Sequence, residues 1–229
     1  MIRRIQLAPI VLTLGLVSGS AHAALQGRDL NGSLGSFEAY YDTDRNITWL
    51  ANANYAKTSG HDTDGKMTWD EATAWAASLS FTDGVNTYDN WRLPTTLQPD
   101  ASCGSGPYFN NCTGSEMGHL FYAELGGTAN QDIRSSADPD LAKFTNLVSY
   151  HYWSATEYAS NTGVAWNFSF YGSQSALDKS NDFYALAVSP GDVAAVPEAQ
   201  TYALMLAGLG LIGWRARRVG DLAPLRGQP

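Results

Sequence analysis

The chain has 229 residues, of which 44% are hydrophobic and only 16% are charged, and its formal net charge at pH 7 is −8. The imbalance is strongest in residues 24–198, which hold 8 basic and 21 acidic residues, a net charge of −13. A nucleic-acid-binding domain needs a basic surface to neutralise phosphates, so we expect no nucleic-acid partner. The same segment, about 175 residues long, is sufficient for one domain with its own hydrophobic core.

The first 23 residues contain the three parts of a secretory signal peptide. Arg3 and Arg4 precede the apolar run LAPIVLTLGLV, and the tripeptide AHA at 21–23 supplies small residues for a cleavage site. We therefore predict a signal peptide over residues 1–23 and a mature, exported protein that begins at Ala24.

Residues 36–51 predict two strands around the turn DTDRN, because aromatic and β-branched residues favour strands and Asp and Asn favour turns. Further along, Thr68 and Glu71 form a capping-box pattern, and apolar residues recur after them at helical spacing. This pattern predicts a helix over residues 69–79.

A second helix is predicted in the segment TGSEMGHLFYAELGG, residues 113–127. Thr113 and Glu116 repeat the capping pattern, and two glycines end the helix. Its apolar face would consist of Met117, Leu120, Phe121 and Leu125.

The final third of the domain predicts strands separated by turns rich in Gly, Ser and Asn, at residues 150–155, 163–172 and 182–189. Two helices among short strands, without a regular alternation of strand and helix, predict an α+β fold rather than a parallel sheet.

Cys103 and Cys112 are the only cysteines in the chain, and eight residues lie between them. In an exported protein, two nearby cysteines most simply form a disulfide that pins a loop. A metal-binding pair is the weaker interpretation, because no histidine lies near them in the sequence and two thiolates alone rarely hold zinc.

Two motifs together resemble the Lcl C-terminal-like domain family: WRLPT at 91–95 and YWSAT at 152–156. Further matching residues are Trp166, Phe170, Gly172 and Lys179. The resemblance covers residues 37–188. It implies a C-type-lectin-like fold, related to that of formylglycine-generating enzymes, with two helices and small, irregular antiparallel sheets. Because Trp91 and Trp153 lie in the two motifs, we expect both rings in the core.

The segment VPEAQTYALMLAGLGLIGWRARR resembles the PEP-CTERM sorting signal of Gram-negative exporters. Its motif residues are Val196, Pro197, Glu198, Arg215, Arg217 and Arg218. Ala199 stands where the signal has a second proline. The apolar run between these groups has thirteen residues, whereas a permanent span of the bilayer needs ~20. Such a short run is sufficient for transient residence, with the arginines held on the cytoplasmic side.

This second resemblance implies a partner and a location. The partner is an exosortase-type membrane protease, and the protein is exported from a Gram-negative cell to the cell surface or the extracellular space through transient inner-membrane anchoring. The predicted division of the chain is a signal peptide at 1–23, an Lcl-like domain at 24–190, a linker with the sorting motif at 191–201, a short transmembrane sorting helix with its arginine cluster at 202–218, and a tail extension at 219–229.

No catalytic motif is recognisable in the sequence. His61, His119 and His151 lack the spacing to partner residues that hydrolases show, and neither G-x-S-x-G nor H-E-x-x-H occurs. We therefore expect no catalytic residues, although the 21 carboxylates leave an unmotifed acid–base pair as an alternative.

Two polar loops place hard oxygen donors at alternate positions, as calcium loops do: Asp42 and Asp44 in the first, Asp62 and Asp64 in the second. Neither loop has the full twelve-residue pattern with its closing Glu, and Asp-rich turns usually form without metal. We expect no cofactor, with calcium as the alternative.

The tripeptide Gln98-Pro99-Asp100 matches the sugar-selecting motif of calcium-dependent lectins, which makes Gln98 and Asp100 weak candidates for ligand binding. Taken together, the sequence predicts an exported, non-catalytic surface or extracellular-matrix protein that binds polysaccharide or a surface partner. The alternatives are an exported enzyme acting on extracellular glycans and a purely structural matrix component.

Overall fold

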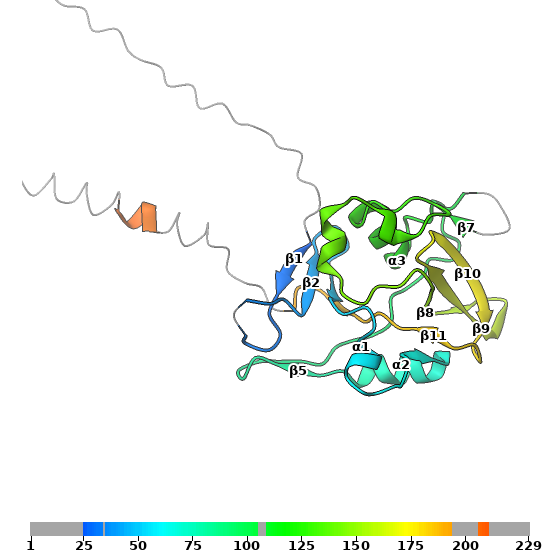
Figure 1. The fold of residues 1–229 in the computed structure, drawn as a ribbon, viewed down its shortest axis with the longest axis horizontal. Coiled ribbons are helices and arrows are strands. Elements are labelled where there is room, and N and C mark those ends of the chain that lie inside the picture. The colour runs from blue at the N-terminus through cyan, green and yellow to red at the C-terminus, as the bar shows by residue number, and fades with distance from the viewer. Residues whose placement is uncertain (1–24, 34, 105–108, 194–205, 211–229) are drawn as a thin grey trace, which may run out of the picture.

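The computed structural model describes residues 25–33, 35–104, 109–193 and 206–210 (Figure 1). The predicted signal peptide, the motif residues Val196, Pro197 and Glu198, and the three C-terminal arginines lie outside the described residues. Residues 206–210 are helical. Within the described part of the chain, no helix has the length and apolar character needed to cross a membrane.

A four-stranded antiparallel sheet contains both the first and the last strand of the domain. Its order is β1 (Gln26–Arg28), β2 (Ala39–Asp42), β3 (Ile47–Leu50) and β12 (Val188–Pro190). β2 and β3 flank the DTDRN turn, which confirms that prediction. After β12 the chain turns at Gly191, whose φ is +73°. Asp192 then forms a two-pronged ion pair with the buried Arg28 on β1.

A six-stranded sheet forms the centre of the domain. Its order is β4 (Lys66–Met67), β11 (Phe183–Tyr184), β8 (His151–Tyr158), β9 (Asn161–Ser169), β10 (Ser173–Asp178) and β7 (Phe109–Asn110). β11 pairs with β8 in parallel, and the other pairs are antiparallel. A small separate hairpin consists of β5 (Phe81–Thr82) and β6 (Thr87–Tyr88). The mixture of strands and few helices is the predicted α+β class.

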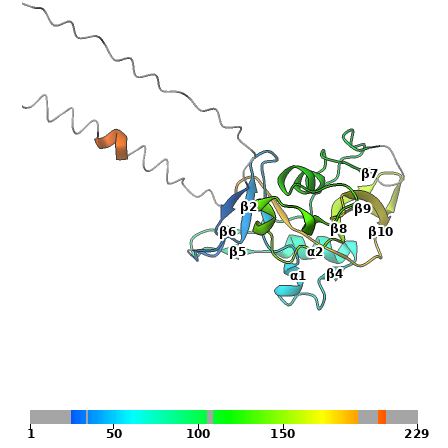
Figure 2. The same cartoon turned by 45° about the horizontal axis from the view of Figure 1, so that its top comes forward.

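Neighbouring residues of β8 point to opposite faces of the six-stranded sheet. Each face is covered by its own group of packed side chains. Tyr152 packs in a cluster with Leu120 and Phe121, whereas Trp153 packs in a second cluster with Trp75 of α2. Figures 1 and 2 accordingly show α1 and α2 on one side of the strands and α3 on the other. The helical segments are α1 (Tyr55–Thr58), α2 (Trp69–Ser78), α3 (Glu116–His119), the π-helix η1 (Leu120–Glu124) and the 3₁₀ turns η2 (Ile133–Ser135) and η3 (Pro139–Lys143).

The first predicted helix is confirmed as α2, with the Thr68–Glu71 capping box formed. Trp91 and Trp153 are both buried, also as predicted. The second predicted helix exists as α3 and η1, and its expected apolar face is buried. Its predicted cap is wrong, however, because the N-cap residue is Ser115 rather than Thr113.

The reason for the wrong cap is that the Glu116 carboxylate has other partners. It accepts two hydrogen bonds of 2.8 Å from the Arg92 guanidinium and one from the backbone N–H of Thr95. Glu116 therefore ties the WRLPT segment to the start of α3 instead of closing the helix on Thr113.

The predicted strand 182–189 is wrong as a single element. Phe183–Tyr184 joins the six-stranded sheet as β11, and Val188–Pro190 joins the four-stranded sheet as β12. The three residues between the strands are buried, so this segment carries the chain from one sheet to the other through the core.

Candidate functional site

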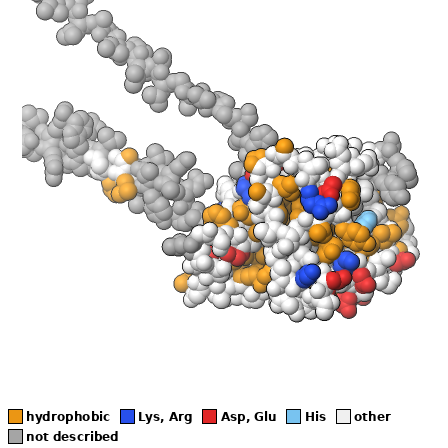
Figure 3. All heavy atoms as spheres, in the orientation of Figure 1, with side chains coloured by type: hydrophobic (Ala, Val, Ile, Leu, Met, Phe, Trp, Pro, Cys, Tyr) orange, Lys and Arg blue, Asp and Glu red, His pale blue; other side chains and the backbone are white. Residues whose placement is uncertain are grey.

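A pocket of about 470 Å³ opens beside the long hairpin of β8 and β9. We call it the aromatic pocket and define it by its lining residues: Leu97, Gln98, Pro99, Asp100, Cys103, Gly104, Phe109, Tyr158, Ala159, Ser160, Trp166 and Gln174. A shallower hollow continues past Phe109, Tyr158 and Trp166 along β9 and β10. On the face seen in Figure 3, hydrophobic side chains also gather over the region of β8–β11.

Three aromatic rings meet in this pocket. Trp166 is buried, while Phe109 and Tyr158 keep 42% and 37% of their surface exposed. The Phe109 and Tyr158 ring centres lie 5.9 Å and 5.6 Å from that of Trp166, and both contacts are edge-to-face. The pocket therefore has a fixed indole as its floor and two accessible rings at its sides.

Gln98, one of the two predicted ligand residues, lines the aromatic pocket, but its polar atoms are used by the fold. Its Oε1 accepts hydrogen bonds of 3.0 Å from Trp166 Nε1 and from the backbone N–H of Ala159. Its Nε2 donates to the carbonyl of Glu157 at 2.7 Å. Gln98 thus holds the Trp166 indole and the turn between β8 and β9 in place, and its polar atoms are not free to bind a ligand.

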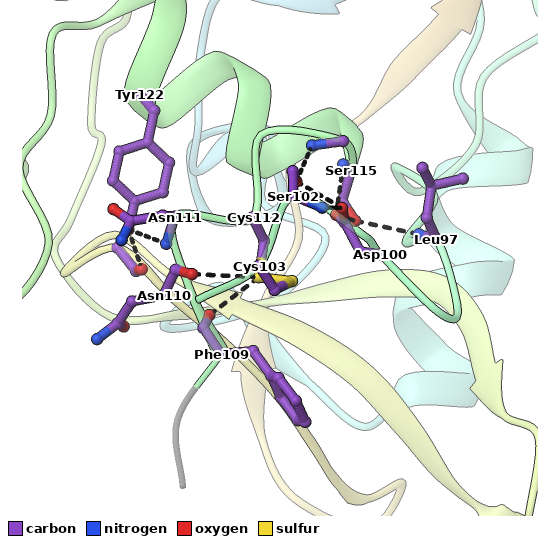
Figure 4. Close-up of a disulfide and its surroundings, with 12 residues drawn as sticks. Leu97, Asp100, Ser102, Cys103, Phe109, Asn110, Asn111, Cys112, Ser115 and Tyr122 are labelled. Atoms are coloured by element: carbon purple, nitrogen blue, oxygen red, sulfur yellow. Dashed lines mark hydrogen bonds between the residues drawn. A yellow bond between two sulfur atoms is a disulfide. The ribbon is translucent and has the colours of Figure 1, made fainter. Parts of the chain in front are cut away.

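Asp100, the second predicted ligand residue, is committed in the same way (Figure 4). Its carboxylate accepts from the backbone N–H groups of Ser102 and Ser115 and from both of their hydroxyls. Burial alone would raise the pKa of Asp100, but these hydrogen bonds outweigh it and lower the pKa below 3.8. Asp100 therefore holds the pocket wall against the start of α3.

The predicted disulfide between Cys103 and Cys112 is present (Figure 4). It links the pocket wall at Cys103 to the residues just before α3, where Cys112 is completely buried. Asp100 lies near both sulfurs, but bonded cysteines have no thiolates to offer, so this group is not a metal site.

Gln174 is one of the pocket residues that sequence reasoning missed. It is 2% exposed, and its side-chain Oε1 is buried without a hydrogen-bond partner. A buried acceptor left unpaired costs free energy unless a ligand or water satisfies it. No sequence signal marks this glutamine, because it lies in the polar segment SQSALD, which was not predicted as a strand.

The four calcium candidates form two separate turns. Asp42 Oδ1 accepts from the backbone N–H groups of Asp44 and Arg45, each at 3.0 Å. Asp62 Oδ1 accepts from those of Asp64 and Gly65, at 2.9 and 2.6 Å. In each turn, one carboxylate oxygen of the first aspartate is thus used by the backbone. The exposed Asp44 and Asp64 do not join a group of metal-ligating side chains in the described residues.

A known sorting signal accounts for the C-terminal segment. Residues 195–218 match the PEP-CTERM protein-sorting motif. The matched range contains Val196, Pro197, Glu198 and the three arginines predicted to act in sorting. The PEP-CTERM motif supports export with surface sorting and implies processing by an exosortase, a membrane protein. No curated protein and no solved structure matches the chain.

The PEP-CTERM match begins where the folded domain is already complete. The last described residue of the domain, Val193, packs against the core cluster around Trp153, and the matched range begins two residues later. The aromatic pocket and the sorting motif therefore lie in separate parts of the chain.

A second group of side chains that could bind a ligand does not line the pocket. Asp42, His119 and Glu124 are buried, and their ligand atoms all lie within 4.8 Å of one another. The sequence had indicated no partner for His119, because its partners come from a turn far away in the chain and from an irregular helix.

Proposed function

We propose that this protein is an exported, non-catalytic surface or extracellular-matrix protein whose folded domain binds polysaccharide in the aromatic pocket. The observation that carries the proposal is the buried Trp166 ring flanked by the exposed rings of Phe109 and Tyr158. Exposed aromatic side chains arranged around a concavity are typical of ligand sites.

The chemistry of the pocket suits a sugar. The C–H faces of a pyranose pack against aromatic rings, and its hydroxyl groups need hydrogen-bond partners. The unpaired Oε1 of Gln174 is an acceptor for one such hydroxyl. Because residues 24–198 carry a net charge of −13, we propose a neutral rather than an acidic polysaccharide.

We also propose that residues 24–190 form an Lcl-like domain with a C-type-lectin-like fold. The support is the resemblance over residues 37–188 together with the observed role of its motifs: WRLPT is tied to α3 through Glu116, and YWSAT lies on the central strand β8. The same proposal includes a signal peptide at 1–23. It also includes release from a transient inner-membrane anchor in a Gram-negative cell.

The test of ligand binding is a glycan array probed with the purified exported protein, with and without calcium. Replacing Tyr158 by Ala should weaken binding about tenfold, because one stacked ring is lost. The matched control is Tyr171→Ala, since Tyr171 is 44% exposed and does not line the pocket. Equal losses in both variants would contradict the pocket. Product formation from the polysaccharide would favour the enzyme alternative, and the absence of any ligand would favour a structural matrix component.

The sorting proposal has its own test. Mass spectrometry of the exported protein should find a chain that begins at Ala24 and ends near residues 196–198. Replacing Arg215, Arg217 and Arg218 by Asn should impair retention and processing, because the positive charges hold the cytoplasmic end of the signal. An exported chain that still contains Leu206 and Leu209, in a host that has the protease, would show an anchor or a decayed signal instead.

A further inference from the structure

The π-helix η1 brings together two side chains that an α-helix would separate. His119 is the last residue of α3 and Glu124 the last residue of η1, five positions later. In an α-helix, residues five apart point about 140° away from each other. Here the backbone N–H of Leu125 bonds to the carbonyl of Leu120, five residues back, and His119 Nε2 lies 3.1 Å from Glu124 Oε1. π-Helical turns are rare and often occur at functional sites.

A third side chain reaches the same point from a distant part of the chain. Asp42 ends β2, and its Oδ2 lies 3.8 Å from His119 Nε2. The other oxygen of Asp42 is fixed by two backbone N–H groups of its turn, and Trp49 Nε1 makes a long hydrogen bond of 3.4 Å to Oδ2. These contacts hold the orientation of the carboxylate, as the partners of metal ligands commonly do.

Among the described residues, His119 is the basic side chain that pairs with the Asp42 and Glu124 carboxylates. The Asp42 side chain is completely buried and that of Glu124 is 3% exposed. No Lys or Arg of the described residues forms an ion pair with either one. Arg45, in the same turn as Asp42, donates instead to the backbone carbonyls of Thr113 and Gly114. Two buried carboxylates without a cation are costly, so a cation bound between them would stabilise the fold.

We infer that Asp42, His119 and Glu124 form a binding site for a divalent transition-metal cation of the zinc type. The two nitrogen–oxygen distances, 3.1 and 3.8 Å, lie on either side of the roughly 3.3 Å that separates ligands placed tetrahedrally about 2.0–2.1 Å from Zn²⁺. At 3.8 Å, Asp42 Oδ2 is too far from Nε2 for a hydrogen bond, but it is suitably placed to share a cation.

The ligand set selects the class of metal. One imidazole nitrogen and two carboxylate oxygens suit Zn²⁺ and its neighbours, whereas Ca²⁺ and Mg²⁺ prefer oxygen alone. With a neutral imidazole, the two positive charges of a divalent cation cancel the negative charges of the Asp42 and Glu124 carboxylates. The imidazole keeps 11% of its side-chain surface exposed, so the group of ligands lies close to the protein surface. The bound cation would fasten the β2–β3 turn to the π-helix.

The test uses the exported protein, purified without a polyhistidine tag, stripped with chelator and then titrated with Zn²⁺. We expect about one Zn²⁺ per chain. Zn²⁺ at about a hundredfold excess over its Kd should raise the Tm by roughly 5–10 °C. Ca²⁺ and Mg²⁺ should leave the Tm unchanged. Because this readout needs only the wild-type protein, it does not depend on any variant folding.

Variants assign the bound metal to these residues. His119→Gln and Glu124→Gln should each reduce Zn²⁺ affinity at least tenfold, and His61→Gln, which changes an exposed histidine, should not. Wild-type protein that binds no Zn²⁺ and shows no shift in Tm would overturn the inference. Binding that persists in both His119→Gln and Glu124→Gln but is lost in His61→Gln would overturn it equally.

Discussion

The turns that begin at Asp42 and Asp62 have the same local hydrogen bonds but different surroundings. In both, the aspartate Oδ1 accepts from the backbone N–H groups two and three residues later. Asp42 is completely buried and faces His119 and Glu124, whereas Asp62 is only partly buried and its turn is rich in exposed residues. Identical turn chemistry therefore yields a candidate metal site in one place and a plain surface loop in the other.

Position in the two sheets explains this difference. The Asp42 turn joins β2 and β3 inside the four-stranded sheet, and its arginine reaches the residues that precede α3. The Asp62 turn leads from α1 into β4, which is the edge strand of the six-stranded sheet. A turn sequence determines the local backbone, but the elements that pack on it determine whether its carboxylate meets other ligands.

The largest effect is expected beside the buried turn, at Gly118 in α3. A Cβ at this position would lie 1.7 Å from the backbone carbonyl oxygen of Cys112, so helix and loop would have to separate. Gly118→Ala should lower the free energy of unfolding by about 3 kcal/mol or more. Urea unfolding of the variant and the wild type measures this loss of free energy. Gly163→Ala is the control, since Gly163 meets only the Asn161 side chain, at 3.3 Å, and it should stay within about 0.5 kcal/mol of wild type.

Direct removal of the two aspartates compares the turns themselves. In chelator-treated protein, Asp42→Ala should cost about 2–4 kcal/mol, because the buried Trp49 indole N–H and two partly buried backbone N–H groups lose their hydrogen-bond partner. Asp62→Ala should cost less than about 1 kcal/mol, because water can replace its carboxylate. Equal costs in urea unfolding would show that burial does not distinguish the two turns.

Gly65 tests how rigid the exposed turn is. Its φ is +84°, and a Cβ there would lie 1.8 Å from Oδ1 of the Asn54 side chain. Gly65→Ala should lower the free energy of unfolding by about 1–2 kcal/mol, from the left-handed backbone and the side-chain clash together. In an Asn54→Ala background the clash disappears, so the same substitution should cost only about 1 kcal/mol. An unchanged cost in that background would show that Asn54 moves freely out of the way.

The smallest expected effect is a pH dependence at Asp62. Burial alone would raise its pKa, but hydrogen bonds from the backbone of Asp64 and Gly65 outweigh burial and lower the pKa below 3.8. A carboxyl whose pKa is lower in the folded state stabilises the protein above its unfolded pKa, about 3.9, and this stabilisation is lost as the pH falls through the lowered value.

Asp62→Asn isolates this contribution. The difference in free energy of unfolding between wild type and Asp62→Asn should be below about 1 kcal/mol at pH ~6, since the site is partly exposed, and should shrink toward pH ~2. A difference that stays constant across this range would show that the turn does not lower the pKa of Asp62.

The sequence predicts this fold well where the signal is local. The capping box of α2 and the strands around DTDRN follow from patterns within a few residues, whereas the burial of Trp91 and Trp153 was expected from the two motifs of the family resemblance. The division of 182–189 between two sheets could not be predicted, because a continuous buried run looks the same whether it forms one strand or crosses between two. β10 was missed because pairing with β9, rather than the composition of SQSALD, makes it a strand.

The sites were predicted less well, for the same physical reason. Gln98 and Asp100 do line the pocket, but their side chains are used in the fold, and the aromatic rings and Gln174 come together only through the β8–β10 strands and β7. His119 meets Glu124 only because the helix widens into a π-helix, a change that hydrophobic periodicity does not reveal. Contacts between distant segments determine both sites.

The ion pair between Arg28 and Asp192 has a mechanical consequence. β1 and β12 are the two outer strands of one sheet, and the chain leaves that sheet at Gly191 toward the sorting motif. If the C-terminal segment is held in a membrane, as proposed above, tension on that segment enters the domain at Val193. The pair with Arg28 then shares this load with the β12–β3 ladder. Pulling on this end of the domain would therefore load both outer strands of the sheet together instead of peeling β12 away alone.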